Sequence, residues 1–448
     1  MSVTLVCNAT IANEGELRNG SVLISGDRIA DVIGPGCRVN VRPDNVVDAT
    51  GCLLLPGLID DHVHFREPGL THKATIASES RAAVAGGVTS FFDMPNCKPQ
   101  TTTIRDIEDK CAIAATDSLA NYSFYLGATR DNIDQIENVD SGTVCGVKLF
   151  MGSSTGGMHV DDREHIYGIM KASPIPVAVH CEDDGIIRSN MAHYEELLNG
   201  EPPVEYHPLI RSAEACYASS SMAVETACRA GARLHIMHIS TARELSLFES
   251  GDVSGKRITA EACPAHLFFS SADYGRLGTR IKCNPAVKDA TDRDALRSAV
   301  RSGLIDVIGT DHAPHLLSEK EGGCRTAASG MPVLPHSLQS MLELADAGVF
   351  GITDIVRTMC HNPAQLFSVK ERGFIRKGYK ADLTLVRRGT DFPQVCDETE
   401  PNLCRWTPFN GHRFGWKVLR TWVNGNQVYC DGKFETGFTA ERILFDRH

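Results

Sequence analysis

Two patterns of apolar and polar positions divide this chain. Near both ends, apolar and polar residues alternate over short stretches bounded by turns such as Asn19-Gly20 and Asn424-Gly425, which predicts β-strands joined by hairpins. Between them, short apolar runs are followed by amphipathic segments, a pattern typical of strands followed by helices. We therefore expect a β unit formed by the ends and an alternating α/β unit in the middle.

The middle unit contains eight predicted strands. The first is the apolar run that begins at Leu53, and the others cover residues 88–94, 122–126, 146–151, 176–180, 234–239, 257–263 and 305–309. Helices are predicted at residues 71–85, 104–116, 163–171, 212–230, 336–347 and 352–367, and a capping-box spacing at Thr241 predicts one more. Eight strands alternating with helices favour a parallel (β/α)8 barrel. The alternative, a doubly wound sheet, usually has a glycine-rich loop after its first strand, which this sequence lacks.

The chain should therefore be an α/β protein with two units. We expect a (β/α)8 TIM barrel over residues 53–370. Residues 1–52 and 371–448 are expected to join in a small β-sandwich beside it, because short strands resume after Gly373.

Charge and composition exclude several classes of partner. The formal net charge of -11 argues against nucleic acid or an anionic membrane. No apolar run is long enough to cross a membrane and no secretion signal is evident, so a cytoplasmic protein is expected. The 16 cysteines are scattered without a Cys-x-x-Cys pair, which predicts reduced thiols.

Two histidines stand at the end of the first predicted barrel strand. His62 and His64 are separated by one residue, so their side chains leave a strand on the same side and can bind one divalent metal ion. A single His-x-His pair is more often a surface feature. Here the metal interpretation is favoured, because further ligands end other strands.

The other candidate ligands also follow apolar strands. They are Lys148, His180, His238 and Asp311. Active sites of (β/α)8 barrels lie at the carboxyl ends of the strands, so these residues should meet, and imidazole with carboxylate suits zinc. Taken singly, each histidine could be a core residue, Asp311 a turn cap and Lys148 a buried ion pair. His235 should face away from His238 and is interpreted as a core residue.

Together these motifs resemble the amidohydrolase superfamily, and within it the dihydroorotases. Asp61-His62-Val63-His64-Phe65-Arg66-Glu67-Pro68-Gly69 is similar to the dihydroorotase signature almost letter for letter. Asp93-Met94-Pro95-Asn96, Cys263-Pro264-Ala265-His266-Leu267 and Thr310-Asp311-His312-Ala313-Pro314-His315 are similar to further family motifs. The resemblance covers nearly the whole chain. The sequence departs from the family at Cys97, at 284–288 and at 329–332, which touches no metal ligand.

The resemblance implies two zinc ions. His62 and His64 would hold one with Asp311, and His180 and His238 would hold the other. Lys148, carboxylated by CO2, would bridge both ions. Some dihydroorotases use an aspartate as the bridge, so the carboxylation rests on the similarity of the sequence around Lys148.

The implied activity is the reversible hydrolysis and cyclisation between dihydroorotate and N-carbamoyl-L-aspartate in de novo pyrimidine (UMP) biosynthesis. Asp311 would take a proton from the attacking water and deliver it to the leaving ring nitrogen. Arg66 would pair with the substrate carboxylate, and Asn96, Asn284 and His315 would add hydrogen bonds to the carboxylate or the ring.

Three other functions share this fold. Allantoinases and dihydropyrimidinases (hydantoinases) have the same metals and chemistry, but their substrates lack the ring carboxylate that Arg66 would bind. A third alternative is a non-catalytic scaffold, which would have lost ligands that are intact here. We expect a small-molecule enzyme that forms a homo-oligomer, a dimer or a tetramer.

Overall fold

The computed structural model describes residues 2–36, 41–152 and 158–447. Its centre is a parallel barrel of eight strands, in which β8 and β9 are two pieces of the third strand on either side of Tyr125. A bridge between Val63 and His312 joins the first strand to the segment that follows the last, and so closes the barrel. The fold predicted from the sequence is confirmed. The strands are β6 (Leu58–Val63), β7 (Val88–Asp93), β8 (Asn121–Phe124), β9 (Leu126–Gly127), β10 (Val147–Phe150), β11 (Val177–His180), β12 (Leu234–Ile236), β13 (Ile258–Ala262) and β14 (Val307–Ile308).

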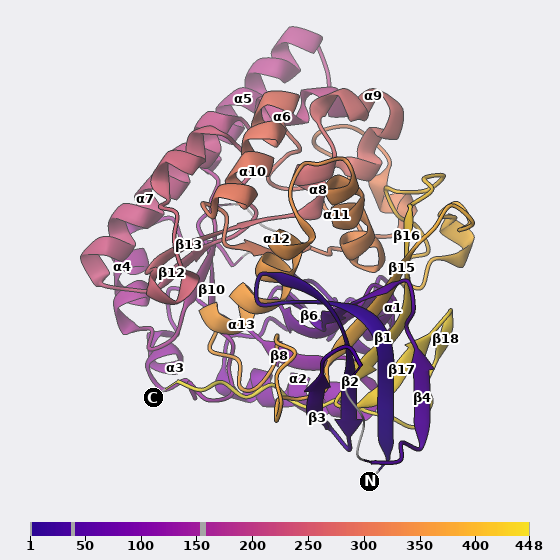
Figure 1. Cartoon of the computed structure of the whole chain (residues 1–448). Helices are drawn as coiled ribbons and strands as arrows, with labels where there is room; N and C mark the ends of the chain where they lie inside the picture. The colour runs from indigo at the N-terminus through magenta and orange to yellow at the C-terminus, as the bar shows by residue number, and fades with distance from the viewer. Residues whose placement is uncertain (1, 37–40, 153–157, 448) are drawn as a thin grey trace.

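Strands from both ends of the chain form a second, mixed sheet at one side of the barrel (Figure 1). Its order is β18-β17-β16-β15-β5-β1-β2-β3, with β4 also paired to β1. It has an apolar core of its own, in which Ile11, Leu54 and Trp422 are buried. These strands are β1 (Val3–Asn13), β2 (Glu16–Ser25), β3 (Arg28–Ile33), β4 (Asn45–Asp48), β5 (Cys52–Pro56), β15 (Leu383–Arg388), β16 (Trp416–Val423), β17 (Asn426–Cys430) and β18 (Lys433–Phe434).

The apolar run from Leu53 is two strands where the sequence predicts one. β5 pairs with β1 and β15 in the terminal sheet, and β6 pairs with β7 in the barrel. The chain turns between them at Gly57, where a Cβ atom would collide with the Thr89 side chain. Both strands are buried throughout, so the apolar pattern gives no sign of the break.

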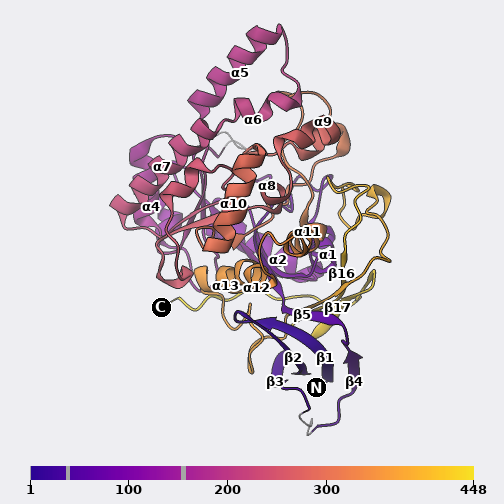
Figure 2. The ribbon, with the colours of Figure 1, turned by 45° about the horizontal axis from the view of Figure 1, so that its top comes forward.

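Helices surround the barrel, as Figures 1 and 2 show from two directions. α5 and α10 were missed by the sequence analysis. In α5 only Ile187 is buried, whereas α10 buries Leu296, Ala299 and Val300 on one face, a helical spacing that could have identified it. The capping-box spacing at Thr241 opens only a 3-10 turn, Arg243–Leu247. The helices are α1 (Ile76–Ala85), α2 (Ile104–Asp117), α3 (Ile133–Glu137), α4 (Arg163–Ala172), α5 (Asp184–Leu198), α6 (His207–Ile210), α7 (Ala213–Ala230), α8 (Pro264–Phe268), α9 (Tyr274–Leu277), α10 (Ala290–Ser302), α11 (Ser337–Asp346), α12 (Ile352–Val356) and α13 (Asn362–Leu366).

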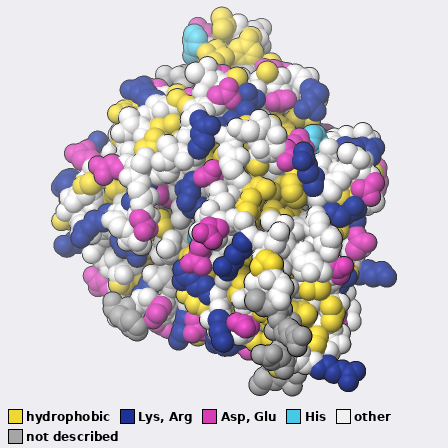
Figure 3. Space-filling view, in the orientation of Figure 1, with side chains coloured by type: hydrophobic (Ala, Val, Ile, Leu, Met, Phe, Trp, Pro, Cys, Tyr) yellow, Lys and Arg dark blue, Asp and Glu magenta, His cyan; other side chains and the backbone are white. Residues whose placement is uncertain are grey.

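Basic and acidic side chains are interspersed over the face in Figure 3, without a large basic patch. Among the described residues, no helix is long and apolar enough to span a membrane. The cysteines within the same ranges are all unpaired thiols, as predicted.

Candidate active site

One cavity lies at the carboxyl ends of the barrel strands. Its lining includes all six predicted metal ligands and three of the four predicted substrate-binding residues: His62, His64, Lys148, His180, His238, Asp311, Arg66, Asn96 and Asn284. The fourth, His315, does not line the cavity but contacts Arg66 on its wall. We call the six predicted metal ligands the metal end of the cavity. Arg66, with His315 and the side chains that contact it, is called the anion end.

The first half of the metal end joins the two ends of the barrel sheet. Asp311 Oδ1, after β14, lies 3.3 Å from His62 Nε2 and 3.1 Å from His64 Nε2, both carried by the β6 end. Burial lowers the pKa of His64 to about 4, so its ring is neutral. Burial alone would raise the pKa of the Asp311 carboxyl, but His62 and His64 lower it overall. A carboxylate and imidazoles that converge in this way fit a divalent cation.

The second half of the metal end brings together β10, β11 and the segment after β12. His180 Nδ1 and His238 Nε2 lie 2.9 Å apart, and burial lowers the pKa of both imidazoles. Lys148 is buried beside them, where its Nζ lies 2.9 Å from the Met237 thioether and 4.9 Å from the centre of the Phe150 ring. Burial lowers the pKa of Lys148 to about 8. These are weak partners for an ammonium group, and they leave the amine available for carboxylation.

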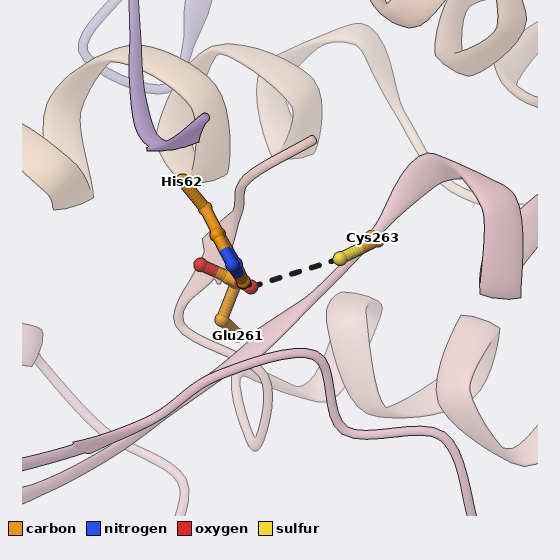
Figure 4. A group of neighbouring side chains, drawn as sticks. All are labelled: His62, Glu261 and Cys263. Atoms are coloured by element: carbon orange, nitrogen blue, oxygen red, sulfur yellow. Dashed lines mark hydrogen bonds and ion pairs between the residues drawn. The ribbon is translucent and has the colours of Figure 1, made fainter. Parts of the chain in front are cut away.

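Glu261 is a site residue that the sequence analysis missed. Its Oε1 atom lies 2.8 Å from His62 Nδ1 and accepts the backbone N–H of His238 at 2.9 Å. Figure 4 shows it beneath His62, with the Cys263 thiol 3.7 Å from the same oxygen. A carboxylate on Nδ1 directs the lone pair of Nε2 towards the cavity. The available signal was a charged residue inside the apolar strand β13, the same signal that identified Lys148.

His235 and His266 lie outside the cavity lining. His235, placed in the core by the sequence analysis, is fully buried, with Nε2 3.2 Å from Asp61 Oδ2. His266 Nε2 lies 3.0 Å from the Pro285 carbonyl oxygen, to which it donates.

At the anion end, Arg66 is buried on the cavity wall. Its Nε donates to the Pro314 carbonyl at 3.1 Å, and its Nη2 lies 3.2 Å from His315 Nε2. Asn96 and Asn284 also contact imidazoles: Asn96 Oδ1 lies 2.8 Å from His64 Nδ1, and Asn284 Oδ1 lies 3.2 Å from His207 Nε2. Asn96 therefore lines the cavity and also orients the His64 ring.

Three residues around the cavity adopt left-handed backbone conformations. The φ angles are 64° at Arg66, 43° at His238 and 49° at Asp311. Such angles cost energy for residues other than glycine and concentrate at functional sites. All three follow a barrel strand closely, so the local turn re-aims the side chain just after the strand ends.

Comparisons with known proteins identify the family of this chain. The pattern of the amidohydrolase family matches residues 53–428. A dihydroorotase from Halobacterium salinarum is 33% identical over 98% of this chain and 99% of its own length. An allantoinase from Bacillus velezensis is 30% identical over 96% of this chain and 94% of its own length.

A similar fold is found in a solved structure. The L-hydantoinase (dihydropyrimidinase) of Arthrobacter aurescens superposes with a TM-score of 0.92 at 24% identity, covering 99% of this chain and all of that one. At this identity the likeness establishes the barrel and the terminal sheet.

Proposed function

Because this chain belongs to the amidohydrolase family and is a hydrolase of cyclic amides, we propose that its substrate is dihydroorotate. The reaction would be the reversible interconversion of dihydroorotate and N-carbamoyl-L-aspartate, a step of de novo pyrimidine (UMP) synthesis. The dihydroorotases from Halobacterium salinarum and Methanosarcina acetivorans, each 33% identical, support this assignment.

The environment of Arg66 is the observation that carries the proposal. The guanidinium is 5% exposed and faces the same cavity as the metal end. Within residues 2–36, 41–152 and 158–447, no carboxylate is in ion-pair contact with it; its hydrogen-bond partners are a backbone carbonyl and an imidazole. A buried cation without a counter-ion is costly, so this site favours an anionic ligand. Dihydroorotate has a ring carboxylate, whereas allantoin and dihydrouracil are uncharged.

The donor set at the metal end would hold two zinc ions, with Lys148 contributing a ligand as its carbamate. His62, His64 and Asp311 would hold one ion, and His180 and His238 the other. When bound, the ions supply an activated water and polarise the amide carbonyl. Lys148 supports the carbamate assignment because its amine is buried beside a thioether and an aromatic ring, where a carboxylated form would gain two cationic partners.

The chain's own residues then move the proton and hold the ring. Asp311 accepts the proton of the attacking water and donates it to the ring nitrogen as the amide bond breaks. Arg66 holds the ring carboxylate through paired hydrogen bonds, which fixes the ring relative to Asp311. In the direction of synthesis, Asp311 removes the proton from the ureido nitrogen that closes the ring.

Turnover of dihydroorotate, allantoin and dihydrouracil by the same preparation tests the proposal. We expect kcat/KM to be largest for dihydroorotate, together with about two zinc ions per chain. Faster turnover of allantoin would assign the chain to the activity of its allantoinase relatives, which are 30% and 31% identical, instead. Metal-free protein without activity on any ring would favour the scaffold alternative.

A further inference from the structure

Lys73 lies behind His315, on the side away from Arg66. It belongs to the loop between β6 and α1, and its Nζ atom is 3.1 Å from His315 Nδ1. Arg66 Nη2 lies 3.2 Å from the other ring nitrogen, Nε2. The His315 ring is therefore held between two cationic side chains.

Both neighbours of this ring can only donate hydrogen bonds. Ammonium and guanidinium groups have no acceptor atom, and a neutral imidazole has one donor and one acceptor. Burial, with the charges of Arg66 and Lys73, lowers the pKa of His315, so the ring is neutral and must choose one tautomer. Whichever nitrogen carries the proton then faces one of these two donors, and the acceptor near the ring is the Ser329 carbonyl.

The position of Glu319 favours the hydrogen bond from Lys73 to His315 Nδ1 over the one from Arg66 to His315 Nε2. Glu319 Oε1 lies 2.7 Å from Lys73 Nζ, and this ion pair directs the ammonium group beside the ring. The other carboxylate oxygen is 3.6 Å from His315 Nδ1, too long for a good hydrogen bond from that nitrogen. Lys73 therefore donates to Nδ1, and the ring proton resides on Nε2.

We propose that Lys73 is a positioning residue for substrate recognition, which fixes His315 as the Nε2–H tautomer and so makes it a donor to the substrate carboxylate. This inference rests on the proposed function and extends it to a residue outside the cavity. With the proton on Nε2, His315 and Arg66 face each other as two donors. A carboxylate oxygen that binds both would resolve this contact.

The charges and the anchoring of the ring agree with this role. Glu319 pairs with Lys73, whereas none of the ion pairs among the described residues includes Arg66, so its guanidinium can still pair with an anionic ligand. The backbone of His315 is fixed by Trp406, whose Nε1 donates to the His315 carbonyl at 2.7 Å. The Ser329 carbonyl offers the ring a neutral acceptor until an anion binds.

Kinetics of Lys73→Met and Lys73→Arg test the role. Lys73→Met is expected to raise the KM for dihydroorotate by about tenfold or more, as for other lost hydrogen bonds to charged groups, with kcat nearly unchanged. Lys73→Arg keeps a charged donor and should restore most of the affinity. Binding of the uncharged carboxamide of dihydroorotate should not change in either variant.

Lys256→Met is the matched control. Lys256 is as buried as Lys73 and pairs with Asp306 at 2.7 Å, but it contacts no imidazole. The Lys256→Met substitution should lower the stability of the protein without raising the KM for dihydroorotate. If Lys73→Met raises KM no more than Lys256→Met does, the role of Lys73 is overturned.

The tautomer can be measured without any substrate. In protein labelled with 15N-histidine, the His315 signals, assigned with His315→Gln, should show a proton on Nε2 in the wild type. In Lys73→Met the proton should move to Nδ1, because Arg66 then donates to Nε2. A proton on Nδ1 in the wild type would overturn the inference. A wild type inactive on dihydroorotate would instead overturn the proposed function, while the tautomer result would stand.

Discussion

The metal end and the anion end of the cavity are built from different kinds of structure. Each metal-end ligand lies in a barrel strand or within a few residues of its carboxyl end, on a rigid parallel sheet. At the anion end, Arg66 follows β6 as closely as Asp311 follows β14, but Lys73 and His315 lie further from their strands, in the loop after β6 and the segment after β14. The ligands are placed by the sheet, whereas the anion-end side chains are placed by one another.

This difference separates chemistry from specificity. Barrel strands position groups for any cyclic amide, so relatives with different substrates can share the metal end. Loops can change without disturbing the sheet, so they are suited to select the ring. Substitutions at the metal end should therefore affect all substrates equally, and those at the anion end should affect only charged ones.

Lys148→Ala should have the largest effect. Without the side chain that we propose as a ligand of both ions, the site should lose bound metal. Since metal polarisation supplies several kcal/mol, turnover of every substrate should then fall about a thousandfold or more. Short carboxylic acids should restore part of the activity. Lys110, equally buried but paired with Asp93, is the control: Lys110→Met should lower stability and keep the metal. Full metal content and activity in Lys148→Ala would exclude a bridging role.

Asp311→Asn should have the second largest effect on turnover. Loss of a general acid–base group typically costs about 10²–10⁴-fold in rate, and both reaction directions should fall together. The protein should remain folded, because an amide of the same shape replaces the carboxylate. Rates measured across the pH range decide the matter: wild-type values throughout would exclude Asp311 as the proton carrier.

Arg66→Met should separate the two ends of the cavity. Removing one partner of a buried charge pair costs about 2–5 kcal/mol, so kcat/KM for dihydroorotate should fall at least about tenfold. Any trace activity on dihydrouracil should be unchanged or improved. The measured quantity is the ratio of the two kcat/KM values. An equal fall for both rings would place Arg66 with the metal end and remove the main argument for a carboxylate substrate.

Glu261→Gln should have the smallest effect. A carboxylate that orients a metal-binding imidazole typically contributes 10- to 100-fold to metal affinity, so competition with a chelator should show a loss of about that size. Glu343→Gln, which alters a carboxylate paired with His412 outside the cavity, is the control. Unchanged metal affinity in Glu261→Gln would contradict an orienting role for this residue.

The sequence predicted the barrel well because its strands are apolar runs at regular intervals. It predicted the boundaries and the number of elements less well where buried positions do not recur with the period of a strand or a helix. Cys52–Pro56 and Leu58–Val63 have the pattern of one strand, and α5 buries only Ile187 and so shows no clear apolar stripe. Glu261 escaped notice because a single buried carboxylate in a strand has no spacing motif.

By itself, the sequence determined the barrel and the set of residues that meet at the metal end. Strand ends in a parallel barrel converge whatever the intervening loops do, so the position of a residue in its strand fixes its place in the site. Only the tertiary structure decided the second layer of contacts. The pairing of Glu261 with His62, and the position of His315 between Arg66 and Lys73, join residues far apart in the chain. Such contacts depend on how loops pack and which polar atoms burial leaves to be satisfied, and no local pattern records either.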